Sequence, residues 1–365
     1  MKIKAYVVHE KNGPYLLEDV ALAEPNANEI LVKNVASGIC HTDEFGRSQG
    51  VEIALPIVLG HEGAGIVAKV GADVKEFAVG DHVAFSYAFC GHCHNCSGGE
   101  PFYCESYNQI NFGGVAADGK TKLHQNGKSV SMFFGQSSFA THSVIHQNSA
   151  VKVDKEVDLT LVAPLGCGVQ TGAGTVLNTL RPSVSDSIAV YGCGSVGLSA
   201  IMAAKVAYCQ TIIAVGGNEK SLRLAQELGA THTVNRKETP DLTQAIKNIT
   251  DGKGVHYAID TSGYGPMIEA AIKALRYHGT MVVLSPDGTI EQFGMGKDVL
   301  MNMVTLKGVC EGDALAKKFI PELIHLYKQG KYPLDKLVTV YDFSDLEKAV
   351  ADSNNGKVIK AVIKM

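Results

Sequence analysis

The stretch SIAVYGCGSVG, residues 187–197, decides the fold. Its first half is apolar and rich in β-branched residues, as expected of a buried strand. Its second half carries a Gly-x-Gly-x-x-Gly pattern, and the apolar run VGLSAIMAAKVA follows at once, as expected of a helix. A strand, a glycine-rich turn and a helix in this order form the dinucleotide-binding fingerprint, with the pyrophosphate at the helix N-terminus. The pattern predicts cofactor contacts at Gly192, Gly194, Ser195, Val196 and Gly197.

Alternation of strands and helices continues downstream of this fingerprint. TIIAV (211–215), HYAID (256–260) and GTMVVLS (279–285) have the composition of buried strands. Helical patterns lie between them, at 219–229, where Gly229 closes the helix, and near 266–277. Such alternation predicts an α/β fold with a doubly wound parallel sheet, the Rossmann arrangement.

The end of the second strand departs from the usual NAD pattern. A carboxylate normally stands there to bind the adenosine ribose, whereas this chain has Gly216 followed by a second glycine. A carboxylate would repel the 2′-phosphate of NADP, and glycine removes both the charge and the bulk. Asn218, Lys220, Ser221 and Arg223 lie close enough in sequence to receive a phosphate. We therefore favour NADP, and leave open that NAD is bound through other contacts.

Composition excludes several classes of protein. The chain has 365 residues, with 45% hydrophobic and 19% charged residues and a net charge of −4, which is typical of a compact protein without affinity for nucleic acid. The nearly uncharged run at 187–209 is long enough for a membrane span, but its glycines favour strand, turn and helix. The first ten residues lack the pattern of a signal peptide, so we expect a cytoplasmic protein with neither a membrane nor a nucleic-acid partner.

The nine cysteines point to metal binding rather than disulfides, because no secretion signal accompanies them. Four of them fall in FCGHCHNCSGGEPFYC, residues 89–104. Four thiolates in one glycine-rich loop suit a closed, tetrahedral structural zinc site. His92 and His94 lie in the same loop and are possible competing ligands, but four matched thiolates favour the cysteines: Cys90, Cys93, Cys96 and Cys104.

A second, dispersed group has a different composition. Cys40, His61 and Cys167 each stand next to glycine or close to it. Two thiolates and one imidazole leave the fourth zinc position open, which is the pattern of a catalytic site. Asp43 and Glu62 accompany them, and carboxylates near metal ligands commonly orient an imidazole and balance charge.

With these motifs in place, the chain resembles the zinc-dependent medium-chain alcohol dehydrogenases over essentially its whole length. The resemblance rests on the order and spacing of GHEGAGIVAKVGADVKEFAVGDHV, the four-cysteine lobe, PLGCGVQTGAG, GCGSVG and LYKQGKYPLDKLV. SYAFCGHC, FFGQSSFATHSV and the overall length are most similar to the aryl- (benzyl-) alcohol dehydrogenase branch.

The resemblance implies two domains. A mostly antiparallel β catalytic domain, GroES-like, would comprise residues 1–168 and 303–365, with the zinc lobe at 89–105. The Rossmann domain would be inserted as residues 169–302. Members of the family form homodimers or homotetramers by joining Rossmann sheets edge to edge, so the resemblance implies an oligomer.

The resemblance also implies roles for single residues. Two zinc ions per chain are expected, one catalytic at Cys40, His61 and Cys167 and one structural at the four-cysteine lobe. Thr42 matches the hydroxyl that hydrogen-bonds the alcohol and starts a proton relay. Where some members end that relay with histidine, this chain has Phe45. The remaining matches concern the nicotinamide cofactor: His41 and Lys360 at the pyrophosphate, and Thr171 beside the nicotinamide.

The implied reaction is hydride transfer between NADP or NAD and a small-molecule alcohol or aldehyde. An apolar pocket for primary aromatic or allylic alcohols is expected from the branch and from the segments that contain Phe45, Tyr87, Phe89, Tyr107 and Phe112. A glutathione-linked formaldehyde dehydrogenase is the alternative enzyme, although no arginine cluster is evident for its anionic adduct. A zinc-ribbon binding module without catalysis and a zinc-free quinone-reductase-like relative are further alternatives. The fingerprint argues against the former, and the Cys40, His61 and Cys167 set against the latter.

Overall fold

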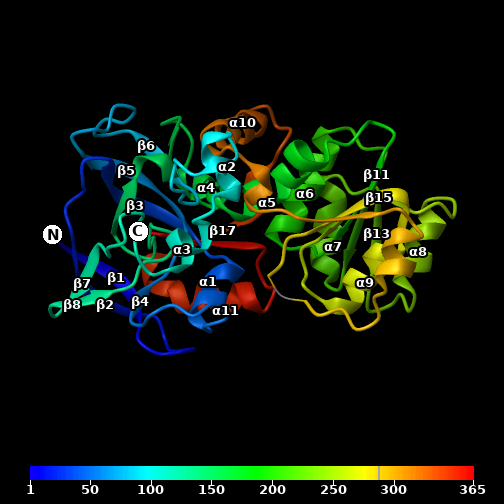
Figure 1. Ribbon diagram of the computed structural model, residues 1–365, viewed down its shortest axis with the longest axis horizontal. Coiled ribbons are helices and arrows are strands. Elements are labelled where there is room, and N and C mark those ends of the chain that lie inside the picture. Colours follow the sequence, from blue (N-terminus) through cyan, green and yellow to red (C-terminus); the bar gives the residue numbers. More distant parts are fainter. Residues whose placement is uncertain (287) are drawn as a thin grey trace. The chain divides into compact units, whose positions relative to one another are not determined.

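The computed structural model describes residues 1–286 and 288–365 and divides the chain into two compact units (Figure 1). The first unit comprises residues 1–167, 315–325 and 334–365, and the second comprises 168–314 and 326–333. The second unit therefore extends past the expected boundary at 302. Two contacts explain this difference: β16 (Thr305–Gly308) joins the sheet of this unit, and Tyr332 donates a hydrogen bond to Ser199 O at 2.9 Å.

A parallel sheet forms the centre of the second unit. Its strand order, β13-β12-β11-β14-β15-β16, runs outward in both directions from the first strand in sequence, which is the doubly wound Rossmann order. The expected α/β fold is thus confirmed. The strands are β11 (Ser187–Tyr191), β12 (Thr211–Gly216), β13 (His232–Asn235), β14 (Val255–Asp260), β15 (Leu275–Val283) and β16.

Helices follow these strands as the alternation predicts. Figure 1 shows α6 to α9 among the parallel strands: α6 (Ser195–Val206), α7 (Glu219–Leu228), α8 (Leu242–Ile249) and α9 (Gly265–Lys273). Shorter helical segments complete the unit: α5 (Gly168–Gly174), η4 (Thr175–Leu180), η5 (Met295–Leu300) and η6 (Glu311–Asp313). α6 is buried from Gly197 to Ala204, which accounts for its uncharged sequence. Within the described ranges, no helix combines the length and apolarity that crossing a membrane requires.

The first unit contains two sheets with mostly antiparallel pairing. One sheet has the order β4-β1-β2-β7-β8, built from β1 (Lys2–Val8), β2 (Leu16–Leu22), β4 (Ile57–Val58), β7 (Leu123–Gln125) and β8 (Lys128–Val130). The other has the order β10-β6-β5-β3-β18-β17, with β9 paired to β3. Its strands are β3 (Glu29–Gly38), β5 (Glu62–Val70), β6 (His82–Phe85), β9 (His142–His146), β10 (Ala150–Val153), β17 (Val338–Asp342) and β18 (Lys360–Lys364).

Short helices connect the strands of this unit. They are α1 (His41–Arg47), α2 (His94–Ser97), α3 (Tyr107–Phe112), α4 (Leu159–Val162) and α11 (Leu346–Asn354), with the short segments η1 (Pro101–Tyr103), η2 (Gln147–Ser149), η3 (Ala163–Gly166), η7 (Leu334–Lys336) and η8 (Phe343–Asp345). α10 (Ala316–Lys328) runs from the first unit into the second.

The register of β3, β5 and β18 brings their ends together. Gly38 at the end of β3 lies opposite Glu62 of β5 and Val362 of β18. A Cβ on Gly38 would lie 2.0 Å from Glu62 Oε2, so a larger residue would displace that carboxylate. Strand ends far apart in the sequence therefore meet at one place, next to the start of α1.

Candidate active site

Cys40, His61, Glu62 and Cys167 form a compact cluster in the first unit. Each offers one ligand atom, and the four atoms all lie within 4.8 Å of one another. Cys40 precedes α1, His61 and Glu62 stand where β5 begins, and Cys167 follows η3. The structure thus brings together the three dispersed ligands expected from sequence, with the carboxylate of Glu62 beside them.

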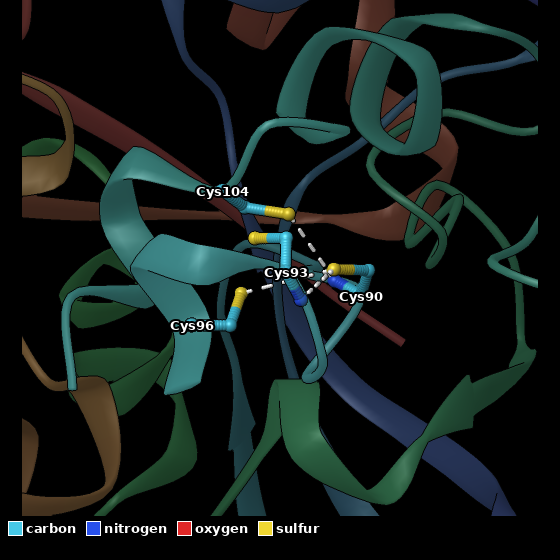
Figure 2. A group of neighbouring side chains, drawn as sticks. All are labelled: Cys90, Cys93, Cys96 and Cys104. Atoms are coloured by element: carbon cyan, nitrogen blue, oxygen red, sulfur yellow. Dashed lines mark hydrogen bonds between the residues drawn. The ribbon is translucent and has the colours of Figure 1, made fainter. Parts of the chain in front are cut away.

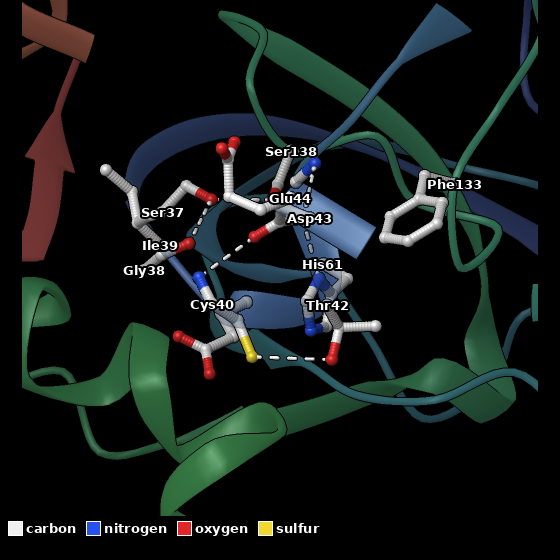
Figure 3. A network of polar contacts seen from close by, with 12 residues as sticks. Ser37, Gly38, Ile39, Cys40, Thr42, Asp43, Glu44, His61, Phe133 and Ser138 are labelled. Atoms are coloured by element: carbon white, nitrogen blue, oxygen red, sulfur yellow. Dashed lines mark hydrogen bonds and ion pairs between the residues drawn. The ribbon is translucent and has the colours of Figure 1, made fainter. Parts of the chain in front are cut away.

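Asp43 fixes the orientation of His61 (Figure 3). Its Oδ1 accepts hydrogen bonds from His61 Nδ1 at 2.7 Å and from Gly60 N at 3.1 Å, and its Oδ2 accepts from Cys40 N at 3.0 Å. A carboxylate only accepts, so a neutral His61 carries its proton on Nδ1 and its lone pair on Nε2. That Nε2 atom is buried and has no hydrogen-bond partner among the described residues. An orphaned buried nitrogen next to two sulfurs is the arrangement that a zinc ion would complete.

The charges in this cluster also fit a cation. A hydrogen bond with Cys167 holds the pKa of the Cys40 thiol well below its ordinary value, despite burial. Burial lowers the pKa of His61, but the charges of Asp43 and Cys40 outweigh it and raise that pKa well above its ordinary value. A thiolate in a buried site needs a positive neighbour. Two sulfurs and one imidazole nitrogen are a donor set that suits zinc.

Lys360 forms an internal ion pair at the edge of the cluster. Its buried Nζ donates to both carboxylate oxygens of Glu62 at 2.9 Å and to Ile39 O at 3.0 Å, which uses all three ammonium protons. Its expected contact with the cofactor pyrophosphate stays a prediction. Burial lowers the pKa of Lys360 and raises that of Glu62, but each partner's charge opposes this, and the net pKa of Lys360 is raised.

Thr42 lies in α1 together with His41 and Phe45. The Thr42 hydroxyl oxygen lies 3.6 Å from Cys40 Sγ, so a proton carrier stands beside the ligand set. Figure 3 shows these two side chains facing each other. His41 is exposed in the same turn. Phe45 follows at the expected position and offers no proton acceptor.

An aromatic wall adjoins His61. The imidazole stacks on Phe134 with ring centroids 4.5 Å apart and meets the edge of Phe133 at 5.5 Å. Phe112 packs on both phenylalanines, and Tyr107 packs on Phe134 at 6.4 Å. Phe112 and Tyr107 were expected near the pocket. The two phenylalanines at 133 and 134 were missed, although the adjacent pair FF in FFGQSSF was a usable signal.

Tyr87 and Phe89, also expected there, continue this aromatic group. Their ring centroids lie 5.9 Å apart, and Tyr87 packs on Tyr107 at 6.1 Å. The wall therefore runs from the His61 ring toward the segment that leads into the four-cysteine lobe.

The four lobe cysteines converge as a second candidate metal site (Figure 2). Their sulfur atoms lie within 4.8 Å of one another, and Cys90 Sγ and Cys96 Sγ are 3.9 Å apart. Zinc–sulfur bonds of about 2.3 Å in a tetrahedron require sulfur atoms about 3.8 Å apart, so the geometry fits zinc. His92 Nδ1 is instead 2.9 Å from Cys90 O, and neither it nor His94 joins the cluster.

Ionisation of the lobe thiols is uneven. The backbone N–H of Cys96 lowers the pKa of the Cys93 thiol to about 6. Burial raises the pKa of the Cys96 thiol to about 12 and also raises that of Cys104. Four adjacent thiolates repel one another, so the full set of ligands forms only around a cation.

The glycine fingerprint in the second unit has the shape that a pyrophosphate needs. Gly192 adopts φ +108°, and a Cβ there would lie 2.3 Å from Thr261 Oγ1. A Cβ on Gly197 would lie 1.8 Å from Gly192 O, so helix and turn pack without side chains. Nothing lies within 4 Å of the Cβ position of Gly194, which leaves open space at the N-terminus of α6, where Ser195 and Val196 begin the helix. The cradle fits a dinucleotide.

The predicted ribose-binding residues have mixed placements. Gly216 ends β12, and Lys220 and Arg223 lie exposed on α7. Asn218 Oδ1 caps α7, accepting from Lys220 N at 2.9 Å and Ser221 N at 3.3 Å, so this oxygen serves the helix. Thr171, expected beside the nicotinamide, lies in α5 with its hydroxyl 3.5 Å from Glu311 Oε2.

Two family models match this chain. Residues 26–155 match the alcohol dehydrogenase GroES-like domain, and residues 195–329 match the zinc-binding dehydrogenase domain. Geraniol dehydrogenase from Castellaniella defragrans is 40% identical over 99% of this chain and 97% of its own length.

Solved structures agree in fold and sequence. An alcohol dehydrogenase zinc-binding domain protein from Burkholderia ambifaria superposes with a TM-score of 0.96 at 43% identity, covering 100% of this chain and 99% of its own. Benzyl alcohol dehydrogenase from Acinetobacter calcoaceticus superposes with a TM-score of 0.95 at 43% identity, with the same coverage. With both domain models matched and relatives of this identity along the whole chain, the protein belongs to the zinc-dependent alcohol dehydrogenase family, whose members are enzymes.

Proposed function

We propose that the chain interconverts primary aromatic or allylic alcohols and their aldehydes, with a preference for NADP. The aromatic wall beside His61 carries the substrate part of this proposal, since flat, unsaturated substrates pack well on aromatic rings. The relatives named for geraniol and benzyl alcohol support it, because both alcohols carry the hydroxyl one carbon from a double bond or a ring.

We assign the two zinc sites to different tasks. Cys40, His61 and Cys167 would hold the catalytic ion, while Glu62, tied to Lys360, would balance charge behind it. The second ion would be held by the four lobe cysteines and would order α2. Thiolate sites of this kind favour a reducing compartment, so a cytoplasmic location stays part of the proposal.

The residues around the catalytic ligands have distinct roles in the proposed reaction. When bound, zinc supplies a Lewis acid that polarises the oxygen of the alcohol or aldehyde. The Thr42 hydroxyl accepts the proton of the substrate hydroxyl and passes it outward. Asp43 keeps His61 in the tautomer that presents Nε2, and Phe133 and Phe134 keep water from the same side of the imidazole. Because Phe45 cannot receive a proton, His41 or water ends the relay.

The cofactor preference rests on Gly216. Its missing carboxylate removes the group that would repel a 2′-phosphate. Ser195, Val196 and the three fingerprint glycines would contact the pyrophosphate, with Thr171 beside the nicotinamide.

A kinetic comparison tests this function. The kcat/KM for benzyl alcohol and geraniol should exceed that for ethanol, and NADP should support at least tenfold higher kcat/KM than NAD, about 1.4 kcal/mol. Equal activity with ethanol would refute the aromatic or allylic substrate class. Higher activity with S-hydroxymethylglutathione would instead identify the glutathione-linked alternative.

We also propose a homodimer or homotetramer. Met295, Leu300, Met301 and Met303 expose 60–72% of their surface, near the edge strand β16 of the second unit. The same stretch lines a cavity of about 480 Å³ with Val299 and Val304. Exposed apolar side chains gathered next to an unpaired strand edge favour association with a second copy.

A further inference from the structure

Two turns of the second unit lie side by side at the carboxyl edge of its sheet. β12 and β13 pair in parallel with Gly216 opposite Asn235, and the next residue, Arg236, donates its backbone N–H to Gly216 O at 2.8 Å. Arg236 therefore leaves the sheet next to Gly217. In a doubly wound sheet this edge is where the dinucleotide binds.

Gly217 leaves room for the Arg236 side chain. A Cβ built on Gly217 would lie 3.0 Å from Arg236 Nε and 3.3 Å from Lys237 Cε. Gly217 is not among the residues with positive φ, so its backbone does not require glycine. The absence of a side chain at Gly217 thus leaves room for the side chains of Arg236 and Lys237.

The guanidinium of Arg236 is held in place by an aromatic ring. Its Cζ lies 5.0 Å from the ring centroid of Tyr264, the residue that precedes α9. Among residues 1–286 and 288–365, no carboxylate forms an ion pair or hydrogen bond with this side chain. Arg236 is exposed, and with Tyr264 it lines a polar cavity of about 430 Å³ whose other charged residues are Asp241, Glu269 and Lys273. Stacking lowers the entropy that a flexible cation loses on binding.

We infer that Arg236, with Lys237 beside it, binds the 2′-phosphate of NADP, and that Tyr264 positions the guanidinium. The inference rests on the proposed NADP preference and names the residue responsible for it. A planar guanidinium matches two phosphate oxygens at once, which the ammonium groups of Lys220 and Lys237 cannot do. Arg236 was missed from sequence because it follows a strand that the sequence did not predict.

Binding of nucleotide fragments tests this inference without turnover. Adenosine 2′,5′-bisphosphate and 5′-AMP differ only by the 2′-phosphate, and calorimetry on the full-length, zinc-loaded enzyme measures both affinities. We expect the wild type to bind the bisphosphate at least tenfold more tightly. Arg236→Ala should reduce that ratio to about twofold or less while leaving 5′-AMP affinity within about twofold of wild type. Arg236→Lys should retain part of the ratio.

Controls separate the possible failures. Lys253→Ala removes an exposed cation just before β14, at the opposite edge of the sheet, and should keep the wild-type ratio. If the wild type binds both fragments equally, the proposed NADP preference is wrong. If the wild type prefers the bisphosphate and Arg236→Ala keeps that preference, the preference stands and the role of Arg236 is refuted. Arg223→Ala then identifies the alternative cation, and melting temperatures show that each variant is folded.

Discussion

Asp43 is a single carboxylate that holds three backbone or side-chain donors from two separate segments. It fixes both the backbone of Cys40 and the imidazole of His61, so its geometry determines that of two ligands. We predict that Asp43→Asn reduces zinc affinity at this site about 10- to 100-fold, because the amide can no longer accept from every donor. Zinc content after dialysis against a chelator measures this loss.

A neighbouring carboxylate supplies the control for Asp43. Glu44 bonds to Tyr15 and Arg47, away from the metal ligands. Glu44→Gln should therefore retain wild-type zinc content. Equal retention of zinc in both variants would contradict the role assigned to Asp43.

Gly216 allows a second residue-scale prediction. Gly216→Asp should lower kcat/KM with NADP at least tenfold relative to NAD, because the new carboxylate faces the 2′-phosphate. A Cβ there would lie 3.1 Å from Cys193 Sγ and 3.3 Å from Leu222 Cδ2, so a loss of stability of about 1 kcal/mol is also expected. Gly216→Ala adds the same Cβ without charge. An equal change of preference in the alanine variant would mean that bulk, not charge, discriminates the cofactors.

The metal ligands could be found from sequence because cysteine spacing and residue chemistry identify them without knowledge of the fold. Lys360 could not be placed in this way. Its partner Glu62 is 298 positions away, and only the pairing of β18 with β3 and β3 with β5 brings them together. Phe133 and Phe134 are visible in the sequence as an aromatic pair, but their contact with His61 depends on tertiary packing.

The four-cysteine lobe illustrates an element that depends on its metal. α2 has four residues, none of them buried, so it cannot be stable alone. We predict that Cys96→Ser removes one zinc per chain and lowers the melting temperature. Metal analysis and hydrogen exchange of residues 89–105 measure both effects. Cys209→Ala changes a buried cysteine outside both clusters and should retain two zinc ions.

Asp352 links α11 to β17 through hydrogen bonds, so the stability of the fold should depend on pH at this residue. Asp352 accepts hydrogen bonds from Lys348, Lys357 and Tyr341 of β17, and the Lys348 contact above all lowers its pKa well below the ordinary 3.8. A carboxyl group with a depressed folded-state pKa stabilises the fold above its unfolded pKa and loses this effect as pH falls.

The matched variant is Asp352→Asn. It should unfold at lower urea concentration than the wild type at pH 7, and the gap should close as pH falls below about 4. Urea unfolding at a series of pH values from 7 downward measures this gap between the two midpoints. A gap that stays constant as pH falls from 7 to about 2 would show that the carboxylate charge contributes nothing.

Some helices and strands could be predicted from the sequence better than others. The strands β11, β12 and β14 are apolar and buried, and the sequence predicted each of them. β13 and β16 are edge strands of four residues, and β16 has no buried residue. Short, exposed strands lack the apolar pattern on which prediction depends. β16, which the sequence did not predict, lies in the second unit beyond the expected boundary at 302.

At the scale of the whole molecule, the exposed methionines of the second unit predict the assembly state. Met303→Lys should shift the protein toward the monomer, because a charge at an apolar interface remains unpaired. Light scattering at several concentrations gives the mass. Val79→Lys alters a residue of similar exposure, 65%, in the first unit and should leave the assembly unchanged. A monomeric wild type would refute the proposed oligomer.

The pairing of β18 with β3 has a consequence for synthesis on the ribosome. All strands of the parallel sheet precede residue 309, so the second unit can begin to fold while the chain is still growing. The first unit cannot finish at that stage, because β3 pairs with β18, which is made after all of these strands. Until residues 360–364 emerge from the ribosome, Glu62 lacks its partner Lys360 and β3 lacks its neighbouring strand β18. Deleting residues 360–364 should therefore abolish activity while sparing nucleotide binding by the second unit.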